Sequence, residues 1–318
     1  MSSPTSNQPH DRYVHEAVYY DSTSQLVEST APSLRRALGQ GEDVALVCTE
    51  DNNRALIEAL GDDDRILVLP RPEIYQKAVT AVAYFRDFVH ERVVAGARRV
   101  CVLGEVDFGT DGRALDEWRR YEALLNHAMS PFPLWSLCGY DTQVLPDSVL
   151  ATGELTHPYL RRDGMQAPNP AHIDPAELMR PTDTDATLVP EVKPAVTVEE
   201  VLDLSDLHRA LKTLLIADGL GQERVEDVVI AVHEVATNGL RHGQPPVTVR
   251  AWLAPGRIVC TVTDRGAGFD DPFAGNVRGG GEELPEGRFG LWLARQLCDE
   301  LTTGRTPEGF TARLVVHH

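Results

Sequence analysis

The sequence predicts two α/β domains joined by a linker. In residues 12–160, short apolar stretches alternate with helical stretches, which is typical of a mostly parallel sheet with helices packed on it. Residues 161–194 are rich in Pro, Asp and Thr and lack apolar periodicity, as linkers do. Residues 195–318 combine helices with an antiparallel hairpin, which predicts an α/β sandwich. We expect residues 1–11 to form a flexible tail.

The first domain is predicted from apolar runs that are short enough to be buried strands. Strands are expected at 44–48, 65–69, 98–105 and 134–139, and helices at 25–38, 52–60, 74–94 and 115–129. No GxxxxGK[ST] loop and no GxGxxG sequence follows any of these strands. Since these loops are what usually hold phosphates, we do not expect catalysis on a nucleotide in this domain.

The second domain is predicted to place its helices on one face of a mixed sheet. Helices are expected at 206–217, 223–241 and 291–297, and strands within 195–204 and at 247–253, 257–264, 300–304 and 310–317. Ala254–Pro255–Gly256 joins two of these strands as a hairpin turn.

Composition and charge argue against several functions. The formal net charge of −18 disfavours direct binding to nucleic acid or anionic lipid, so any effect on transcription would act through another protein. The chain has no run of 18 apolar residues and no signal-peptide pattern at its start, so we expect no membrane segment. Its five cysteines are scattered without a CxxC pair, which predicts buried thiols in a reducing cytoplasm and no zinc site.

The most informative stretch is VVIAVHEVATNGLRHG at 228–243. Its Glu234, Asn238 and His242 are four residues apart, so they share one stripe of the predicted helix. Further along, Asp264 ends a predicted strand and is followed by Gly266 and Gly268. A carboxylate and an amide on one helix, with an aspartate beside two glycines, are what a magnesium–nucleotide site needs.

These segments resemble the sequence boxes of GHKL ATPases, specifically the anti-sigma-factor serine kinase branch. The N box is Glu234-Val-Ala-Thr-Asn238, the G1 box is DRGAG at 264–268, the G2 box is GRFGLW at 287–292, and GFTARL at 309–314 matches the last strand. The resemblance covers nearly all of 195–318 and implies ATP and Mg²⁺ as cofactors.

The resemblance also assigns roles near the adenine and the phosphates. Asp264 would accept a hydrogen bond from the adenine amino group, and Gly266 and Gly268 would let the backbone approach the base. Asn238 would offer an oxygen to magnesium. Glu234 would orient or deprotonate the attacking hydroxyl as the catalytic base.

Four further residues complete the predicted pocket. Gly290 and Leu291 begin the G2 helix, where free backbone N–H groups can meet phosphate. Thr311 would reach the base side. His242 contacts the nucleotide or acts as a cation favourable to the helix dipole, and the sequence leaves both open.

Two features depart from the family pattern. Gly239 follows Asn238 where Ala is common, and a glycine inside a helix costs roughly 1 kcal/mol. In the G2 box, two residues rather than one separate Gly287 from Gly290, which puts lid closure and phosphate transfer in question. The glycine-rich segment 278–287 is flexible enough to be that lid.

The first domain resembles the MEDS sensory domain, which is considered RecA-like in fold. The resemblance rests on Glu105 at a strand end, Tyr121–Glu122 with Asn126, LCGYD at 137–141 and LTHPYL at 155–160. It implies a sensory module for a small-molecule effector, with Glu105 and His157 as ligand contacts. Alternatively, Glu105 caps a helix, His157 packs in the interior, and Cys138 fills the core.

By resemblance, the chain is expected to sequester a sigma factor and to phosphorylate an anti-sigma-factor antagonist on Ser or Thr. Its ATP-binding half is expected to be able to form a homodimer. One alternative is an ATP-dependent binding switch without catalysis. Another is a histidine kinase fragment, with His208 as a phosphoacceptor or with a separate phosphoacceptor protein.

Overall fold

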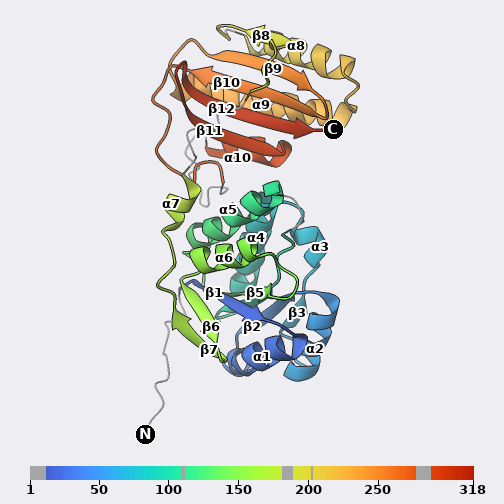
Figure 1. Ribbon diagram of the computed structural model, residues 1–318, viewed down its shortest axis with the longest axis vertical. Coiled ribbons are helices and arrows are strands. Elements are labelled where there is room, and N and C mark those ends of the chain that lie inside the picture. The colour runs from blue at the N-terminus through green and yellow to red at the C-terminus, as the bar shows by residue number, and fades with distance from the viewer. Residues whose placement is uncertain (1–11, 109–111, 181–188, 202, 277–287) are drawn as a thin grey trace. The chain divides into compact units, whose positions relative to one another are not determined.

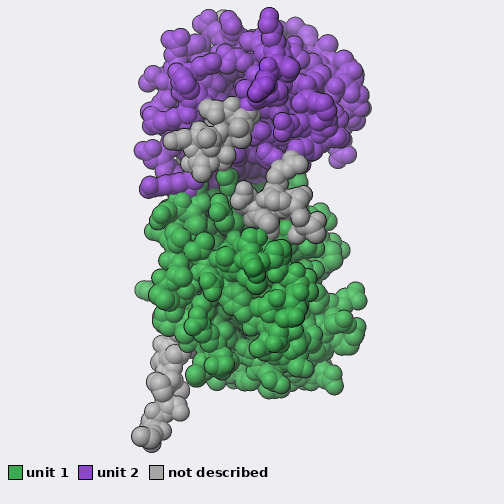
Figure 2. Space-filling model, in the orientation of Figure 1, with its two compact units in different colours: residues 1–179 green, residues 180–318 purple. Residues whose placement is uncertain are grey.

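The computed structural model describes residues 12–108, 112–180, 189–201, 203–276 and 288–318. The chain forms two compact units, Met1–Met179 and Arg180–His318 (Figures 1 and 2). The first unit reaches further than the predicted domain end at residue 160. Residues 161–179 contribute to two strands and a helix of this unit, although their polar composition resembles that of a linker.

The first unit is built on a seven-stranded sheet in the order β3-β2-β4-β5-β1-β6-β7. Its strands are β1 (Val14–Tyr20), β2 (Asp43–Val47), β3 (Ile66–Val68), β4 (Val100–Gly104), β5 (Leu134–Asp141), β6 (Tyr159–Arg162) and β7 (Met165–Pro168). Only the pairing of β6 with β7 is antiparallel among these pairs, which confirms the prediction of a mostly parallel sheet.

Helices cover both faces of this sheet (Figure 1). They are α1 (Thr23–Gly39), α2 (Glu50–Leu60), α3 (Arg71–Ile74), α4 (Ala78–Val94), α5 (Gly112–Ala128), α6 (Asp147–Thr156) and α7 (Pro175–Met179). The first two begin at side-chain caps, since Ser22 accepts from the N–H of Gln25 and Thr49 from that of Asn52. Leu26, Leu34 and Leu56 of these helices pack with Val18 and Leu46 in one apolar core.

Strand β1 lies between β5 and β6, and the sequence does not predict it. Its sequence VHEAVYY has a buried His15 and Glu16 at its second and third positions, and these polar residues interrupt the apolar run that marks a buried strand. Arg161 forms an ion pair with Glu16 at 2.8 Å, which offsets the cost of burying that carboxylate.

The second unit has a five-stranded sheet in the order β11-β12-β10-β9-β8. Its strands are β8 (Val196–Val198), β9 (Thr248–Ala254), β10 (Arg257–Asp264), β11 (Glu300–Thr306) and β12 (Gly309–His317), and its helices are α8 (Leu204–Ala217), α9 (Gln222–His242) and α10 (Arg288–Leu297). Every described strand pair is antiparallel, so the expectation of a mixed sheet was wrong.

The helices of the second unit pack on one face of this sheet, as the α/β sandwich requires. One apolar core joins helix residues such as Val228 and Ala294 to strand residues such as Cys260 and Leu314. Val259 and Val315 alternate with these strand residues and pack with Trp252 on the opposite face. Over the described part of the chain, no helix is long and apolar enough to cross a membrane.

Candidate functional site

The polar stripe of α9 lies against the start of α10. Glu234 and Asn238 are half-buried, and neither side chain has a hydrogen bond or ion pair to any residue that the structure describes. A Cβ atom placed on Gly290 would lie 2.5 Å from Glu234 Oε2 and 3.5 Å from Asn238 Nδ2. The structure thus brings these three predicted residues together, with no side chain at 290 to fill the space beside them.

His242 and Leu291 lie at the ends of the same two helices. His242 is exposed in the last turn of α9, whereas Leu291 is buried and belongs to the apolar core. Leu291 therefore offers a ligand its backbone rather than its side chain, and it anchors the first turn of α10.

Asp264 ends β10 and is almost completely buried. Its Oδ1 accepts hydrogen bonds from the backbone N–H of Gln244, at 3.2 Å, and of Gly266, at 2.6 Å. Over the described residues, both of these bonds end on Oδ1 and none ends on Oδ2. The carboxylate is therefore held in a fixed orientation, with one oxygen left to accept a hydrogen bond from another donor.

Two glycines make room for this carboxylate, and a third makes room for the backbone of Asp264. A Cβ atom at Gly243 would overlap the carboxyl group of Asp264, and one at Gly266 would lie 2.6 Å from its Oδ1. A Cβ atom at Gly309 would overlap the backbone oxygen of Asp264. The sequence marks Gly243 only as the residue after a helix, so its close approach to Asp264 was not predicted.

Gly268 lies at a turn of the backbone, as a glycine that lets the chain turn was expected to, and it also packs against a neighbouring strand. Its φ of +70° favours glycine, and a Cβ atom there would overlap the ring of Phe310. Gly268 thus shapes the loop after β10 by packing against β12.

Thr311 lies beside Asp264 because β12 pairs with β10. The register sets Thr311 opposite Thr263 and Phe310 opposite Asp264. The hydroxyl oxygen of Thr311 is buried, 2.9 Å from that of Thr263 and 3.1 Å from that of Thr306. A hydroxyl can both donate and accept, so this chain of three can adjust to a ligand near Asp264.

In the first unit, Glu105 follows β4 and is buried with both carboxylate oxygens occupied. Oε1 accepts from Asn52 Nδ2 at 2.6 Å and from the hydroxyl of Tyr20, and Oε2 accepts from the backbone N–H of Thr49 at 2.7 Å. Since Thr49 caps α2, these contacts match the alternative in which Glu105 supports a helix start. A role for Glu105 in ligand binding stays a prediction.

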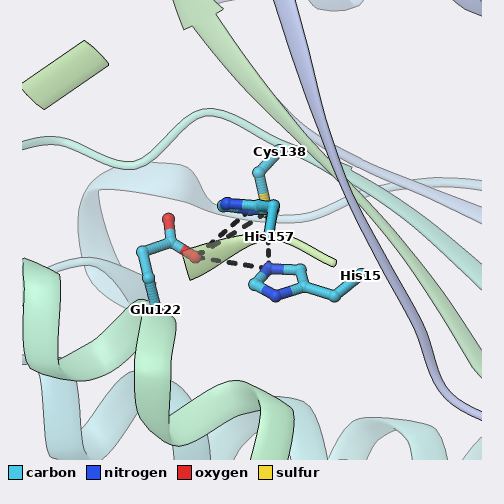
Figure 3. A group of neighbouring side chains, drawn as sticks. All are labelled: His15, Glu122, Cys138 and His157. Atoms are coloured by element: carbon cyan, nitrogen blue, oxygen red, sulfur yellow. Dashed lines mark hydrogen bonds and ion pairs between the residues drawn. The ribbon is translucent and has the colours of Figure 1, made fainter. Parts of the chain in front are cut away.

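His157, the other predicted ligand contact, lies in a separate cluster with His15, Glu122 and Cys138 (Figure 3). His157 Nε2 lies 3.7 Å from Glu122 Oε2, and His15 Nε2 lies 3.3 Å from the same oxygen. Burial lowers the pKa of His15 and of His157 to about 3 and raises the pKa of Glu122. Sequence reasoning singled out Glu122 and Cys138 within their motifs but missed His15, because β1 itself was missed.

Comparison with known families assigns each unit. Residues 14–158 match the family described as MEDS: MEthanogen/methylotroph, DcmR Sensory domain. Residues 199–316 match the family described as Histidine kinase-like ATPase domain. The chain joins a MEDS sensory domain to a histidine kinase-like ATPase domain.

Two other comparisons add little to this assignment. No match was found among curated proteins. A crystal structure of the RsbU and RsbW domains of a Mycobacterium tuberculosis protein is similar at 23% identity over 39% of this chain, with a TM-score of 0.28. This chain spans only 33% of that one.

The ATPase domain can also accommodate a side chain at Gly239. A Cβ atom there would lie 3.4 Å from both methyl groups of Val247 and 3.8 Å from Asp264 Oδ2, which are ordinary contacts. Gly239 is therefore not required for close packing. The second departure from the family pattern starts at Gly287, and both it and the predicted lid at 278–287 lie outside the described residues.

His208, considered as a phosphoacceptor, lies on α8 within the ATPase domain. Its Nε2 is 2.8 Å from Nδ1 of His233 on α9, and both residues are partly buried. Burial and then the neighbouring His233 lower the pKa of His208. This nitrogen is engaged between two helices, which does not favour the histidine kinase alternative.

Proposed function

We propose that the ATPase domain binds ATP with Mg²⁺ and acts as an anti-sigma-factor-type protein serine/threonine kinase under control of the MEDS domain. The observation that carries the proposal is the state of Asp264, whose Oδ1 is held by two backbone donors while Oδ2 has no described donor. Glu234 and Asn238 have no partner among the described residues, lie beside Gly290, and supply the polar groups that the phosphate end of ATP requires.

Asp264 accounts for a choice of adenine over guanine. A buried carboxylate can only accept hydrogen bonds, and the adenine amino group donates at the position where guanine carries a carbonyl oxygen. Guanine would therefore leave Oδ2 facing another acceptor in a buried site, which is costly. Thr311 follows Phe310, the residue that pairs with Asp264 across the two strands. Its hydroxyl completes the polar wall at the adenine end of the site.

Asn238 suits a magnesium ion that is held mainly by phosphate oxygens. Mg²⁺ prefers oxygen ligands and often takes only one or two from the protein, and the Asn238 amide has no described partner that competes for its oxygen. When bound, Mg²⁺ neutralises charge on the phosphates. Asn238 would hold this ion one helical turn from Glu234.

We assign to Glu234 the role of base in a phosphoryl transfer. The hydroxyl oxygen of a substrate Ser or Thr would form a bond to the γ-phosphorus, while the bond from this phosphorus to the β,γ-bridging oxygen breaks and ADP leaves. The hydroxyl proton would pass to Glu234. By family resemblance, the substrate is an anti-sigma-factor antagonist and the sequestered partner is a sigma factor.

The test uses the full-length chain with labelled ATP, Mg²⁺ and the antagonist that co-purifies with it from native lysate. We expect Glu234→Gln to lower phosphate transfer by about 10²- to 10⁴-fold, the usual contribution of a general base, with little change in ATP affinity. Glu226→Gln is the matched control, because Glu226 is exposed on the same helix. Transfer by Glu234→Gln at the wild-type rate would exclude Glu234 as the base.

The same experiment separates catalysis from a binding switch. A pull-down with and without ATP reports whether the partner is held in a nucleotide-dependent way. If the wild-type chain binds ATP and changes partners but transfers no phosphate at any Mg²⁺ concentration, the ATPase domain is a non-catalytic switch. If calorimetry detects no ATP binding, both functions fail together.

A further inference from the structure

Four buried side chains in the MEDS domain direct their ligating atoms at one point. They are His15 on β1, Glu122 on α5, Cys138 on β5 and His157 directly after α6. Each residue offers one ligand atom, and these four atoms all lie within 4.8 Å of one another. Figure 3 shows the four side chains turned toward a common centre. None is more than 8% exposed.

The hydrogen bonds of His157 fix which of its ring nitrogens is bare. Its Nδ1 lies 2.9 Å from the carbonyl oxygen of Gly153, and a carbonyl can only accept, so the proton is on Nδ1. Its Nε2 then carries a lone pair, and this fully buried atom has no hydrogen-bond partner. A buried lone pair without a donor, directed at three other ligating atoms, calls for a cation or a proton to satisfy it.

His15 is held in the same tautomer by Asn126. The Asn126 Nδ2 donates to the carbonyl oxygens of Thr156, at 2.7 Å, and Glu122, at 3.3 Å, so the amide oxygen faces His15 Nδ1 at 3.2 Å. His15 therefore donates from Nδ1 and presents a bare Nε2 to the cluster. Histidines that bind metals are oriented in this way, by a hydrogen bond from the other ring nitrogen.

Glu122 and Cys138 complete the set. Tyr140 donates its hydroxyl hydrogen to Glu122 Oε1 at 3.1 Å, which leaves Oε2 for the centre. His15 Nε2 lies 3.3 Å from Cys138 Sγ and 3.3 Å from Glu122 Oε2, and Oε2 lies 3.7 Å from His157 Nε2 and 4.0 Å from Cys138 Sγ. Bonds of about 2.0–2.3 Å to a tetrahedral zinc ion place its ligands about 3.3–3.6 Å apart. The two separations of 3.3 Å match this range, and those of 3.7 Å and 4.0 Å would shorten when a metal binds.

The geometry points to a transition-metal site in the MEDS domain, of the kind that holds Zn²⁺, formed by His15 Nε2, His157 Nε2, Cys138 Sγ and Glu122 Oε2. Two imidazoles, a thiolate and a carboxylate are a borderline-soft donor set, which disfavours Mg²⁺ and Ca²⁺. A dication with one thiolate and one carboxylate is neutral overall, which suits a fully buried site. Binding releases the protons of the Cys138 thiol and of the Glu122 carboxyl group.

The ligands come from four separate segments of the chain. The spacing rule that argued against zinc in the sequence concerns pairs of nearby cysteines, and it does not apply to a site with one cysteine. The metal would join two neighbouring strands of the parallel sheet to α5 and to the end of α6.

The first experiment measures metal content in the full-length chain, purified without a histidine tag from cells grown with added zinc. We expect about one metal ion per chain in the wild type and less than a tenth of that in Cys138→Ser and in His157→Asn. Cys101→Ser is the matched control, because Cys101 is also buried beside a carboxylate, with its Sγ 3.2 Å from Glu42 Oε2. Circular dichroism establishes which variants are folded.

The second experiment does not depend on variants that fold. Wild-type protein is stripped with a chelator and titrated with Co²⁺, which should produce a thiolate-to-cobalt charge-transfer band and the strong visible bands of a tetrahedral site. Asn126→Ala should keep these bands but weaken metal affinity by about 10- to 100-fold, as loss of a hydrogen bond to a ligand does. Wild-type protein without bound metal and without these bands, or Cys138→Ser with undiminished metal, would overturn the site.

Discussion

Three buried carboxylates, two in the MEDS domain and one in the ATPase domain, differ in how far the protein itself satisfies them. Glu105 accepts hydrogen bonds on both oxygens from fixed neighbours. Asp264 has two backbone donors on one oxygen and no described donor on the other. Glu122 has one hydroxyl donor and faces two imidazole nitrogens that carry no proton.

The difference separates a structural role from two kinds of ligand binding. A carboxylate with donors on both oxygens gains less from a ligand, because three of its roughly four acceptor sites are already used. A carboxylate with one open oxygen and a fixed orientation is prepared for a donor such as an amino group. A carboxylate oxygen that meets two bare nitrogens faces other acceptors, and a cation or a proton between them resolves that arrangement.

The largest expected effect concerns the acid sensitivity of the MEDS cluster after its metal is removed. Burial lowers the pKa of His15 and of His157 to about 3, below their usual 6.5, so the unfolded chain binds more protons below pH 6.5. The stability that each neutral histidine contributes should be fully present at pH 7 and be lost as pH falls toward 3. At pH 5 the unfolding free energy should be lower by about 2 kcal/mol for each histidine. The raised pKa of Glu122 acts in the opposite direction and offsets part of this loss.

Urea unfolding of chelator-treated protein between pH 7 and pH 5, followed by near-ultraviolet circular dichroism, measures this dependence. His157→Asn should remove the contribution of one histidine from the pH dependence of the unfolding free energy of the MEDS domain. A wild-type transition that does not move over this range would contradict the assignment of two buried neutral imidazoles.

Asp264→Asn tests the half-satisfied carboxylate in the ATPase domain. The two backbone donors would hold the amide oxygen in the place of Oδ1, so the amide nitrogen would point outward and face the adenine amino group. Two donors would then oppose each other, and ATP affinity should fall by about 100-fold, or about 3 kcal/mol. Calorimetry with ATP measures the loss. Asp206→Asn, an exposed residue on α8, should leave affinity unchanged.

Glu105→Gln tests the saturated carboxylate. A glutamine would present its amide nitrogen to the N–H of Thr49 or to the Tyr20 and Asn52 donors, so at least one buried donor would lose its acceptor. The MEDS transition should lose about 2 kcal/mol in urea, while metal content stays at the wild-type level. Glu58→Gln, exposed on α2, is the control. Loss of metal without loss of stability would contradict a purely structural Glu105.

The positions of the residues in the proposed ATP pocket follow local rules that the sequence shows. Glu234 and Asn238 share a helix stripe by their spacing, and Asp264 ends a strand whose apolar pattern is clear. The MEDS cluster was not predictable from spacing, because His15 and Cys138 are 123 residues apart and only the pairing of β1 with β5 brings them together. The strand that carries His15 was itself hidden, since His15 and Glu16 break its apolar run.

The smallest expected effects come from substituting two glycines at the same end of α9. Gly239→Ala should stabilise α9 by up to about 1 kcal/mol and keep ATP affinity, because its methyl group meets Val247 at ordinary contact distance. Gly243→Ala should lower ATP affinity about tenfold or more, because the same methyl group would displace the carboxylate of Asp264. Thermal denaturation measures the stability of both variants, and calorimetry measures their ATP affinity. If Gly239→Ala weakened ATP binding as much as Gly243→Ala, the affinity would depend on flexibility of the helix end, and the fixed orientation of Asp264 would not be its cause.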